Sequence, residues 1–311
     1  MALDPELREY YNRLRSELEP MVCAGAEARR DRLRATAALL GESRPVALDV
    51  TEFSIDLEGR TLAARLYRPH GVVAPALAVF FHGGGWVVGD LDTHDLVAAR
   101  CADALRCAVV SVDYRRAPEA PFPAPCDDAR DAVIWLAEHR ARLGLATNTL
   151  ALIGDSAGAH LAAGAALAVN ALAPGLVSAQ LLLYPMVDKD FGRPSYAANA
   201  SGPGISLADI EFYWASFLPA AASQDDGRAL LLVRTPLSAS PATVLAVAEF
   251  DPLSDEGREY AAFLKRHGTR VELIEAEGMT HGFMRLQGAS NAARAWAARI
   301  VERFGALWTR S

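Results

Sequence analysis

Short apolar runs alternate with helical stretches along most of this chain, and this alternation restricts the possible fold more than any other feature of the sequence. Strands that alternate with helices form a mainly parallel sheet with helices on both faces. The sequence therefore predicts an α/β fold. The apolar runs lie at 76–81, 107–114, 149–154, 177–184, 242–250 and 269–276, and the helical stretches at 93–105, 126–143, 157–172, 255–267 and 290–307.

The chain before residue 76 follows two other patterns. Residues 1–44 predict helices, with an apolar face that includes Leu7 and Leu14. Residues 46–68 instead alternate between apolar and polar side chains, which is typical of strands. The turn-like pair Glu58-Gly59 divides this stretch, so we expect an antiparallel hairpin there.

One long segment, 188–235, interrupts the alternation and is rich in Gly, Pro and Ser around a single predicted helix at 207–218. Such an insertion at the carboxyl end of a strand would lie above the catalytic face. We therefore predict a helical cap built from 1–44 and 188–235, over a catalytic body formed by 45–187 and 236–311. The alternative is a surface excursion with no part in binding.

Net charge argues against one large class of partners. The formal net charge is -7 at pH 7, whereas a nucleic-acid groove requires a concentrated basic face. The densest basic stretch, Arg29 to Arg34, is interrupted by Asp31 and reads as a solvated helix face. We therefore expect no nucleic-acid partner.

Cysteine spacing and hydropathy predict where the protein acts. The chain has 4 cysteines without CxxC spacing, which we interpret as reduced thiols. Its N-terminus is charged and lacks the apolar core of a secretory signal. No apolar run reaches the roughly 18 residues that would cross a bilayer. We expect a cytoplasmic protein with no stable membrane association.

The stretch LALIGDSAGAHLAA places a Gly-x-Ser-x-Gly sequence between an apolar run and a helical segment. A sharp strand-to-helix turn of this kind, the nucleophile elbow, exposes its serine at the edge of a sheet. Gly154 and Gly158 lack the Cβ atoms that so tight a crossing excludes. Ser156 is therefore the candidate nucleophile, and the adjacent Asp155 is expected to face away from it in a structural role.

A second glycine-rich motif, HGGGW, follows the apolar run at 76–81 directly. A parallel strand would deliver it to the same edge of the sheet as Ser156. Its backbone N–H groups could stabilise the negative charge of a tetrahedral intermediate. The alternative, a phosphate-binding loop, would require a following Lys-Ser/Thr, and the chain has Val87-Val88 there instead.

A serine hydroxyl becomes a good nucleophile only beside a base, which in turn requires an acid to orient it. His281 follows the run at 269–276 and would lie where the loops converge, whereas His160 lies behind the elbow and is expected to pack. Asp251 follows the run at 242–250 at once, and Asp255 is better placed to serve the next helix N-terminus. The predicted order Ser156, Asp251, His281 is that of α/β-hydrolases.

The other four histidines outside the glycine-rich motif fall in expected loops or on polar helix faces. None has the spacing of a zinc-binding motif such as HExxH, so we predict no metal site. These residues are His70, His94, His139 and His267.

Together, HGGGW, GDSAG, DPLSDEG, HGF and YRRAPEAPFPAP closely resemble the hormone-sensitive-lipase-like branch of the α/β-hydrolases. The resemblance implies an α/β-hydrolase fold with a helical cap, and an oxyanion hole formed by the N–H groups of Gly84, Gly85 and Ala157. It implies no cofactor, and it favours a homodimer through 270–307. Two sites differ from the usual pattern: Ala159-His160 where Gly-Asn is common, and Arg116 and Ala120 where Leu and His are common.

The sequence thus predicts a serine esterase that hydrolyses small-molecule carboxylic esters of short to medium chain length through an acyl-enzyme. Trp86, Tyr213 and Trp214 are candidates for the wall of its substrate pocket, although a helix face that packs into the body would explain such aromatic residues as well. Two alternatives stay open: an amidase or deacetylase, and a non-catalytic small-molecule receptor on the same fold. Family receptors of that kind lack the catalytic histidine, whereas this chain has His281.

Overall fold

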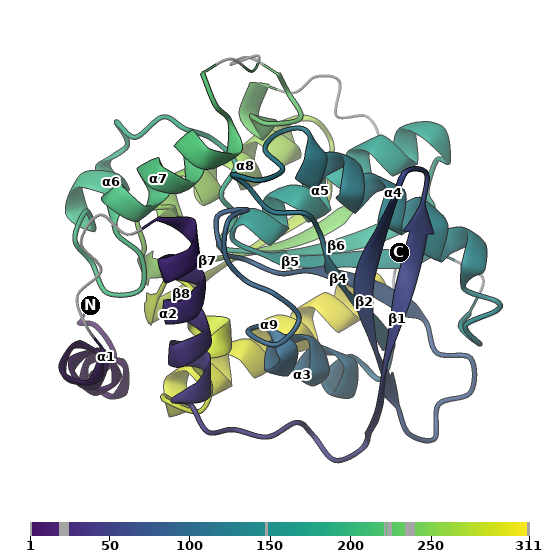
Figure 1. Cartoon of the computed structure of the whole chain (residues 1–311), viewed down its shortest axis with the longest axis horizontal. Coiled ribbons are helices and arrows are strands. Elements are labelled where there is room, and N and C mark those ends of the chain that lie inside the picture. The colour runs from purple at the N-terminus through teal and green to yellow at the C-terminus, as the bar shows by residue number, and fades with distance from the viewer. Residues whose placement is uncertain are drawn as a thin grey trace.

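The computed structural model describes residues 2–18, 25–146, 149–220, 222, 226–233 and 240–309. Its centre is one sheet of eight strands in the order β1-β2-β4-β3-β5-β6-β7-β8 (Figure 1). Strands β3 to β8 run parallel to one another, which confirms the predicted mainly parallel α/β sheet. These strands are β3 (Leu77–Phe81), β4 (Ala108–Asp113), β5 (Leu150–Asp155), β6 (Val177–Leu183), β7 (Ala242–Phe250) and β8 (Val271–Thr280).

The predicted hairpin forms one end of the sheet. Strands β1 (Leu48–Leu57) and β2 (Arg60–Pro69) pair antiparallel, with Leu57 opposite Arg60 across the Glu58-Gly59 turn. Gly59 has a φ of +71°, a conformation that glycine adopts at little cost. Strand β2 then joins the rest of the sheet through an antiparallel pairing with β4.

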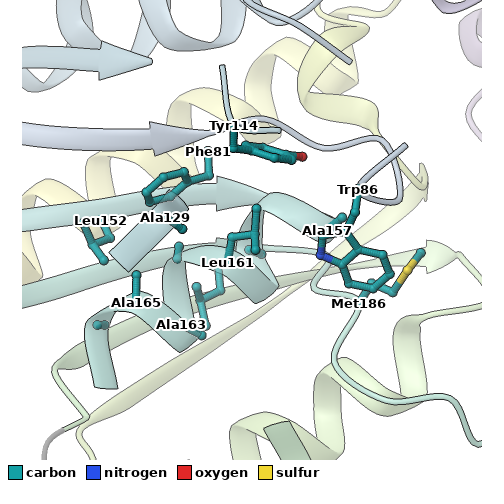
Figure 2. Close-up of a cluster of buried hydrophobic side chains, with 14 of the residues drawn as sticks. Phe81, Trp86, Tyr114, Ala129, Leu152, Ala157, Leu161, Ala163, Ala165 and Met186 are labelled. Atoms are coloured by element: carbon teal, nitrogen blue, oxygen red, sulfur yellow. The ribbon is translucent and has the colours of Figure 1, made fainter. Parts of the chain in front are cut away.

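Helices cover both faces of the sheet, and each face has its own hydrophobic cluster. Alternate residues of β3 divide between them: Phe81 belongs to the cluster shown in Figure 2, and Phe80 to the one on the opposite face. This period of two follows from the geometry of a strand buried on both sides. Helices α4 (Ala124–His139), α5 (Ala157–Leu172) and α8 (Ser254–Arg266) contribute to the first cluster, and α3 (Asp95–Leu105) and α9 (Asn291–Trp308) to the second.

The predicted cap segments supply further helices beside the ends of the parallel strands (Figure 1). Leu7 and Leu14 of the first of these helices are buried, as their spacing predicts. Parts of both cap segments, namely residues 1, 19–24, 221, 223–225 and 234–235, lie outside the described residues. The helices are α1 (Pro5–Glu17), α2 (Ala26–Ala38), α6 (Pro194–Ala198) and α7 (Leu207–Phe217). The described part of the chain also has two short 3-10 turns, η1 (Leu231–Val233) in the second cap segment and η2 (Phe283–Arg285) after β8.

Candidate active site

Ser156 occupies a strained turn between β5 and α5. Its backbone has φ +56° and ψ −121°, a region that costs a non-glycine residue ~1–3 kcal/mol. The two glycines of the motif explain how the turn is accommodated. A Cβ on Gly154 would lie 2.2 Å from the carbonyl oxygen of Gly158, and one on Gly158 would lie 2.0 Å from that of Phe81. The GDSAG sequence therefore allows strand and helix to cross closely enough to expose the serine.

The structure brings Ser156, His281 and Asp251 into one line of hydrogen bonds. His281 Nε2 lies 2.9 Å from Ser156 Oγ, and His281 Nδ1 lies 2.8 Å from Asp251 Oδ2. Because a carboxylate oxygen accepts, Nδ1 carries the proton and Nε2 can accept from the serine hydroxyl. Asp251 is fully buried, Ser156 is 3% exposed and His281 is 8% exposed, so all three residues are largely shielded from water.

Asp251 and Asp255 have separate roles, as their positions in the sequence suggest. The second carboxylate oxygen of Asp251 accepts from the Leu253 N–H at 2.9 Å, which fixes its orientation toward His281. Asp255 lies in the first turn of α8, where it accepts from the Ser195 N–H at 2.8 Å and pairs with Arg258 at 2.9 Å. It does not take part in the line of hydrogen bonds to Ser156.

The glycine-rich loop after β3 lies against the elbow. Within the described part of the chain, the N–H groups of Gly84, Gly85 and Ala157 donate no hydrogen bond, whereas the Gly83 N–H donates to Asp155 Oδ1 at 2.8 Å. Gly84 and Gly85 also line the cavity that contains Ser156. Among the described residues, the predicted oxyanion donors therefore keep unused N–H groups near Ser156, and the neighbouring N–H anchors the loop.

Behind this loop, Asp155 and His94 form a buried polar pair. No sequence pattern indicated this role for His94. His94 Nε2 lies 3.6 Å from Asp155 Oδ2, and its Nδ1 lies 3.0 Å from Thr93 Oγ1. Burial lowers the pKa of His94. Burial also acts to raise the pKa of Asp155, but His94 and the Gly83 N–H hold it below its ordinary value. Asp155 thus stays a buried acceptor for the loop, the structural role predicted for it.

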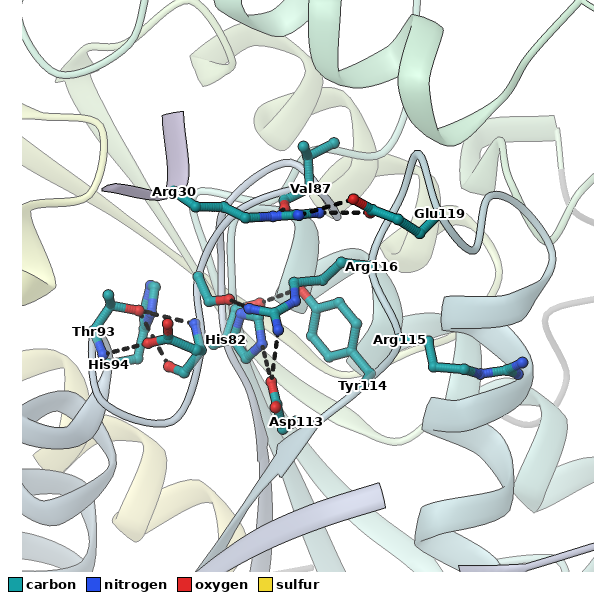
Figure 3. Close-up of polar contacts among 12 residues, drawn as sticks. Arg30, His82, Val87, Thr93, His94, Asp113, Tyr114, Arg115, Arg116 and Glu119 are labelled. Atoms are coloured by element: carbon teal, nitrogen blue, oxygen red, sulfur yellow. Dashed lines mark hydrogen bonds and ion pairs between the residues drawn. The ribbon is translucent and has the colours of Figure 1, made fainter. Parts of the chain in front are cut away.

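The outer side of the same loop is held by arginines and a tyrosine (Figure 3). Arg30 of α2 donates to the Val87 carbonyl at 2.9 Å and pairs with Glu119, and Tyr114 donates to the His82 carbonyl at 2.8 Å. Arg116, at a position where the family commonly has Leu, donates to the Gly89 carbonyl. This departure from the family pattern therefore adds a hydrogen bond to the loop.

A cavity of about 790 Å³ opens at Ser156. Its wall includes Ser156 and His281 from the body, and Tyr213 and Phe212 from α7. Of the three predicted pocket residues, only Tyr213 is among the described residues that line it. Residues from α1 and α2 complete the wall, among them Tyr10, Tyr11, Leu14, Arg29 and Leu33.

The predicted pocket role of Trp86 and Trp214 is not supported by this cavity. Both rings lie in the core that joins α7 to the body: Trp86 stacks on Phe217 at 4.0 Å and contacts Trp214 at 4.7 Å between ring centroids. Their side chains are 0% and 3% exposed, respectively. The other interpretation, that these aromatic rings pack into the body, is correct for both residues. Trp214 lies on the face of α7 that packs against Trp86, and Tyr213 faces the cavity.

His160, where the family commonly has Asn, is also part of this core. Its Nδ1 accepts from the Trp86 indole N–H at 3.3 Å, and its Nε2 lies 3.0 Å from the Ala229 carbonyl. The ring is fully buried. His160 therefore packs rather than catalyses, as expected, and it ties Trp86 to the segment that follows α7.

Among the residues that the structure describes, no three His, Cys, Asp or Glu side chains gather where they could hold a metal ion. None of the described helices is both long enough and apolar enough to cross a membrane.

Comparison with known proteins agrees with this geometry. Residues 78–285 match the family model described as an alpha/beta hydrolase fold. The chain is 33% identical to an ethyl acetate hydrolase of Pseudomonas putida, over 97% of this chain and 98% of that one. It is 38% identical to the carboxylesterase NlhH of Mycobacterium tuberculosis, over 83% and 81% of the two chains.

Solved structures show the same likeness over almost the full length. A thermostable esterase from Pseudomonas putida superposes with a TM-score of 0.93 at 27% identity, covering 99% of this chain and 98% of that one. A hyperthermophilic esterase from Pyrobaculum calidifontis gives 0.90 at 32% identity, covering 98% and 99%. By its sequence, its fold and the match to the family model, the chain belongs to the α/β-hydrolase family, in the hormone-sensitive-lipase-like branch.

Proposed function

We propose that this enzyme is a serine carboxylesterase in which Ser156 is the nucleophile, His281 the base and Asp251 the acid that orients it. The observation that carries the proposal is the unbroken line of hydrogen bonds from Ser156 Oγ through His281 to Asp251, with distances of 2.9 and 2.8 Å. In the first half-reaction Ser156 Oγ attacks the ester carbonyl while His281 Nε2 takes its proton. His281 then gives that proton to the leaving alcohol, and the acyl group stays on the serine.

The second half-reaction uses the same residues with water in place of the serine. His281 takes a proton from a water molecule as the water oxygen attacks the acyl carbonyl, and it then gives this proton to Ser156 Oγ as the bond between the acyl group and Oγ breaks and the carboxylic acid leaves. In both halves the carbonyl oxygen becomes negatively charged. The N–H groups of Gly84, Gly85 and Ala157 are proposed to stabilise that charge, a contribution of ~10²- to 10³-fold in rate for each donor.

The cavity supports short to medium acyl chains as substrates. At about 790 Å³ it has the size of a small-molecule site, and cap residues such as Tyr213 and Phe212 form its wall. Tyr213 lies against the glycine-rich loop, because a Cβ on Gly85 would lie 2.1 Å from Tyr213 Cγ, and it lines the same cavity as Ser156. A similar relative from Pseudomonas putida is named for the hydrolysis of ethyl acetate, a very small ester.

A substrate series tests this proposal. Ethyl esters from acetate to dodecanoate, followed by acid release at constant pH, are expected to give the highest kcat/KM at short to medium chain length. The Ser156→Ala protein should lose the activity while it keeps the fold. An amidase would instead cleave the matched ethyl amides with comparable kcat/KM, and a receptor would bind the esters without turnover.

We also propose that the protein acts in the cytoplasm as a homodimer through β8 and α9. Strand β8 is the last strand of the sheet, so its outer edge can pair with a second copy. Light scattering after gel filtration is expected to give twice the chain mass, and a monomer at micromolar concentration would contradict this interface.

A further inference from the structure

Arg285 lies in the cavity wall, four residues after His281, and forms no ion pair with any of the described residues. It ends the short turn η2, is partly buried, and lines the same cavity as Ser156 and His281. Within the described part of the chain, no carboxylate lies within 4.0 Å of its guanidinium, and its side chain donates no hydrogen bond. Its Nη2 would lie 3.1 Å from a Cβ placed on Gly282, so the charge is held beside the residue that follows the base.

The acidic groups of the same wall are already engaged. Asp209 forms an ion pair with Arg29 and accepts from Ser206 at 2.6 Å. Asp155 accepts from the Gly83 N–H and faces His94. Neither of these two carboxylates lies within 4.0 Å of the Arg285 guanidinium.

The effect of this charge reaches both walls of the cavity. Burial raises the pKa of Tyr11, from α1, and of Tyr213, from α7, to about 12 in each case, and Arg285 is one of the groups that lower them. Arg285 also lowers the pKa of Asp155, although burial is the largest influence there. A negative charge brought into this space would therefore be stabilised.

We propose that Arg285 binds the carboxylate of an ester substrate that carries one, in its acyl part or in its alcohol part. A guanidinium can make two parallel hydrogen bonds to a carboxylate, and these charge-assisted bonds are about twice as strong as neutral ones. The inference rests on the proposed esterase function and narrows its substrate class from simple esters to half-esters of dicarboxylic acids or esters of hydroxy acids.

Two pairs of substrates separate the two positions of the carboxylate. Monoethyl succinate carries it in the acyl part, and ethyl 4-methylpentanoate is its neutral counterpart of similar shape. The acetate ester of 3-hydroxypropanoate carries it in the alcohol part, and 3-methylbutyl acetate is the neutral counterpart. For each pair, the quantity of interest is the ratio of kcat/KM for the anionic ester to kcat/KM for the neutral one, followed by acid release at constant pH.

In the Arg285→Met protein we expect this ratio to fall ~10- to 100-fold for at least one pair, the magnitude of a lost hydrogen bond to a charged group. The fall should come mainly from a higher KM, because binding outside the reacting atoms is lost in ground state and transition state alike. Arg285→Lys should keep part of the ratio. Arg8→Met is the control, since Arg8 is exposed on α1 and is not among the described residues that line the cavity, and its ratio should change less than ~3-fold.

A ratio that stays unchanged in Arg285→Met for both pairs would overturn the proposal, as would an equal loss on anionic and neutral esters. Should Arg285→Met fail to fold, an inhibition experiment on the unaltered enzyme tests the same proposal. Succinate should inhibit ethyl acetate hydrolysis competitively and more strongly than succinamide does. The difference between the two inhibitors should shrink at high salt. Equal inhibition by the two would contradict a carboxylate site. An unaltered enzyme that cleaves neither neutral ester would contradict the esterase function itself, a result distinct from either of these.

Discussion

The proposed body and the proposed cap of this enzyme differ in the contacts that hold each of them together. In the body, backbone passes so close to backbone that a single added carbon at Gly158 would lie 2.0 Å from the Phe81 carbonyl. Between the cap helices, polar and cation–π contacts are prominent. Arg29 of α2 pairs with Asp209 of α7, and its guanidinium lies 4.3 Å from the centre of the Phe212 ring.

This difference separates the part of the molecule that determines the reaction from the part that determines which substrate is used. A close-packed body tolerates few changes, so it holds Ser156, His281 and the glycine-rich loop in one geometry. The cap segments supply many of the side chains that line the cavity, so changes in these segments would reshape it. The comparison predicts that changes to the catalytic line abolish turnover, whereas changes to the cavity wall alter which ester is used.

The largest expected effect comes from Asp251→Asn. An amide at this position would favour the wrong tautomer of His281, and kcat is expected to fall by ~10⁴-fold with little change in stability. Steady-state kinetics on ethyl acetate and the melting temperature measure the two quantities. Asp255→Asn is the matched control, because Asp255 contacts Ser195 and Arg258 instead, and its kcat should change less than ~3-fold. A large loss in both proteins would mean that the acid has been assigned to the wrong residue.

Within the cap, Trp214 and Phe212 should respond in opposite ways although they lie on the same helix. Trp214→Ala removes a buried ring that packs on Trp86, and should lower the free energy of unfolding by ~3–5 kcal/mol. Phe212→Ala removes a partly exposed ring that lines the cavity, so its main effect should be a changed chain-length preference. Urea unfolding measures the stability of the two variants, and the ethyl ester series measures their chain-length preference. Similar stability losses in the two proteins would remove the distinction between the core face and the cavity face of α7.

A smaller effect concerns Glu256, a fully buried carboxyl that accepts from the Tyr196 hydroxyl at 2.6 Å and from the Val187 N–H at 2.7 Å. Burial raises its pKa from 4.5 to about 8. Between these values the folded state binds a proton that the unfolded state has lost, so this group's contribution to stability falls as pH rises from about 4.5 to about 8. Glu119, with a pKa lowered to about 2 chiefly by Arg30, titrates below this window when folded.

Glu256→Gln should therefore flatten the decline in melting temperature between pH 5 and pH 8, since an amide does not titrate there. Thermal unfolding of both proteins across that range measures the effect. If the two curves stay parallel, Glu256 is ionised in the folded protein at neutral pH.

The body was predictable because its elements are coded locally. Strand β7 begins and ends where the apolar run at 242–250 does, and α5 spans the predicted 157–172. Asp251 follows an apolar run directly, Ser156 and His281 lie a few residues past theirs, and the carboxyl ends of parallel strands meet at one edge of a sheet. Sequence patterns could therefore bring the three residues together without any knowledge of their contacts.

The cap and its surroundings were less predictable because their contacts join distant segments. Tyr213 and Trp214 are neighbours in the sequence, and only the packing of α7 against Trp86 decides which of them faces the cavity. The sequence around His94 does not indicate that this residue is buried, because its partner Asp155 lies on β5, far away along the chain. Arg285 belongs to no motif, and only the three-dimensional structure shows that no carboxylate of the described residues lies within 4.0 Å of its guanidinium.

The most direct measurement of the central claim is the site of reaction with a fluorophosphonate, which modifies an activated serine. Intact-mass and peptide analysis of the treated protein should show one added group, on Ser156, and Ser156→Ala should remain unlabelled. The Asp251→Asn protein should be labelled much more slowly, because its histidine no longer activates the serine. An unlabelled native enzyme, or a label on any other serine, would contradict the relay from Ser156 through His281 to Asp251.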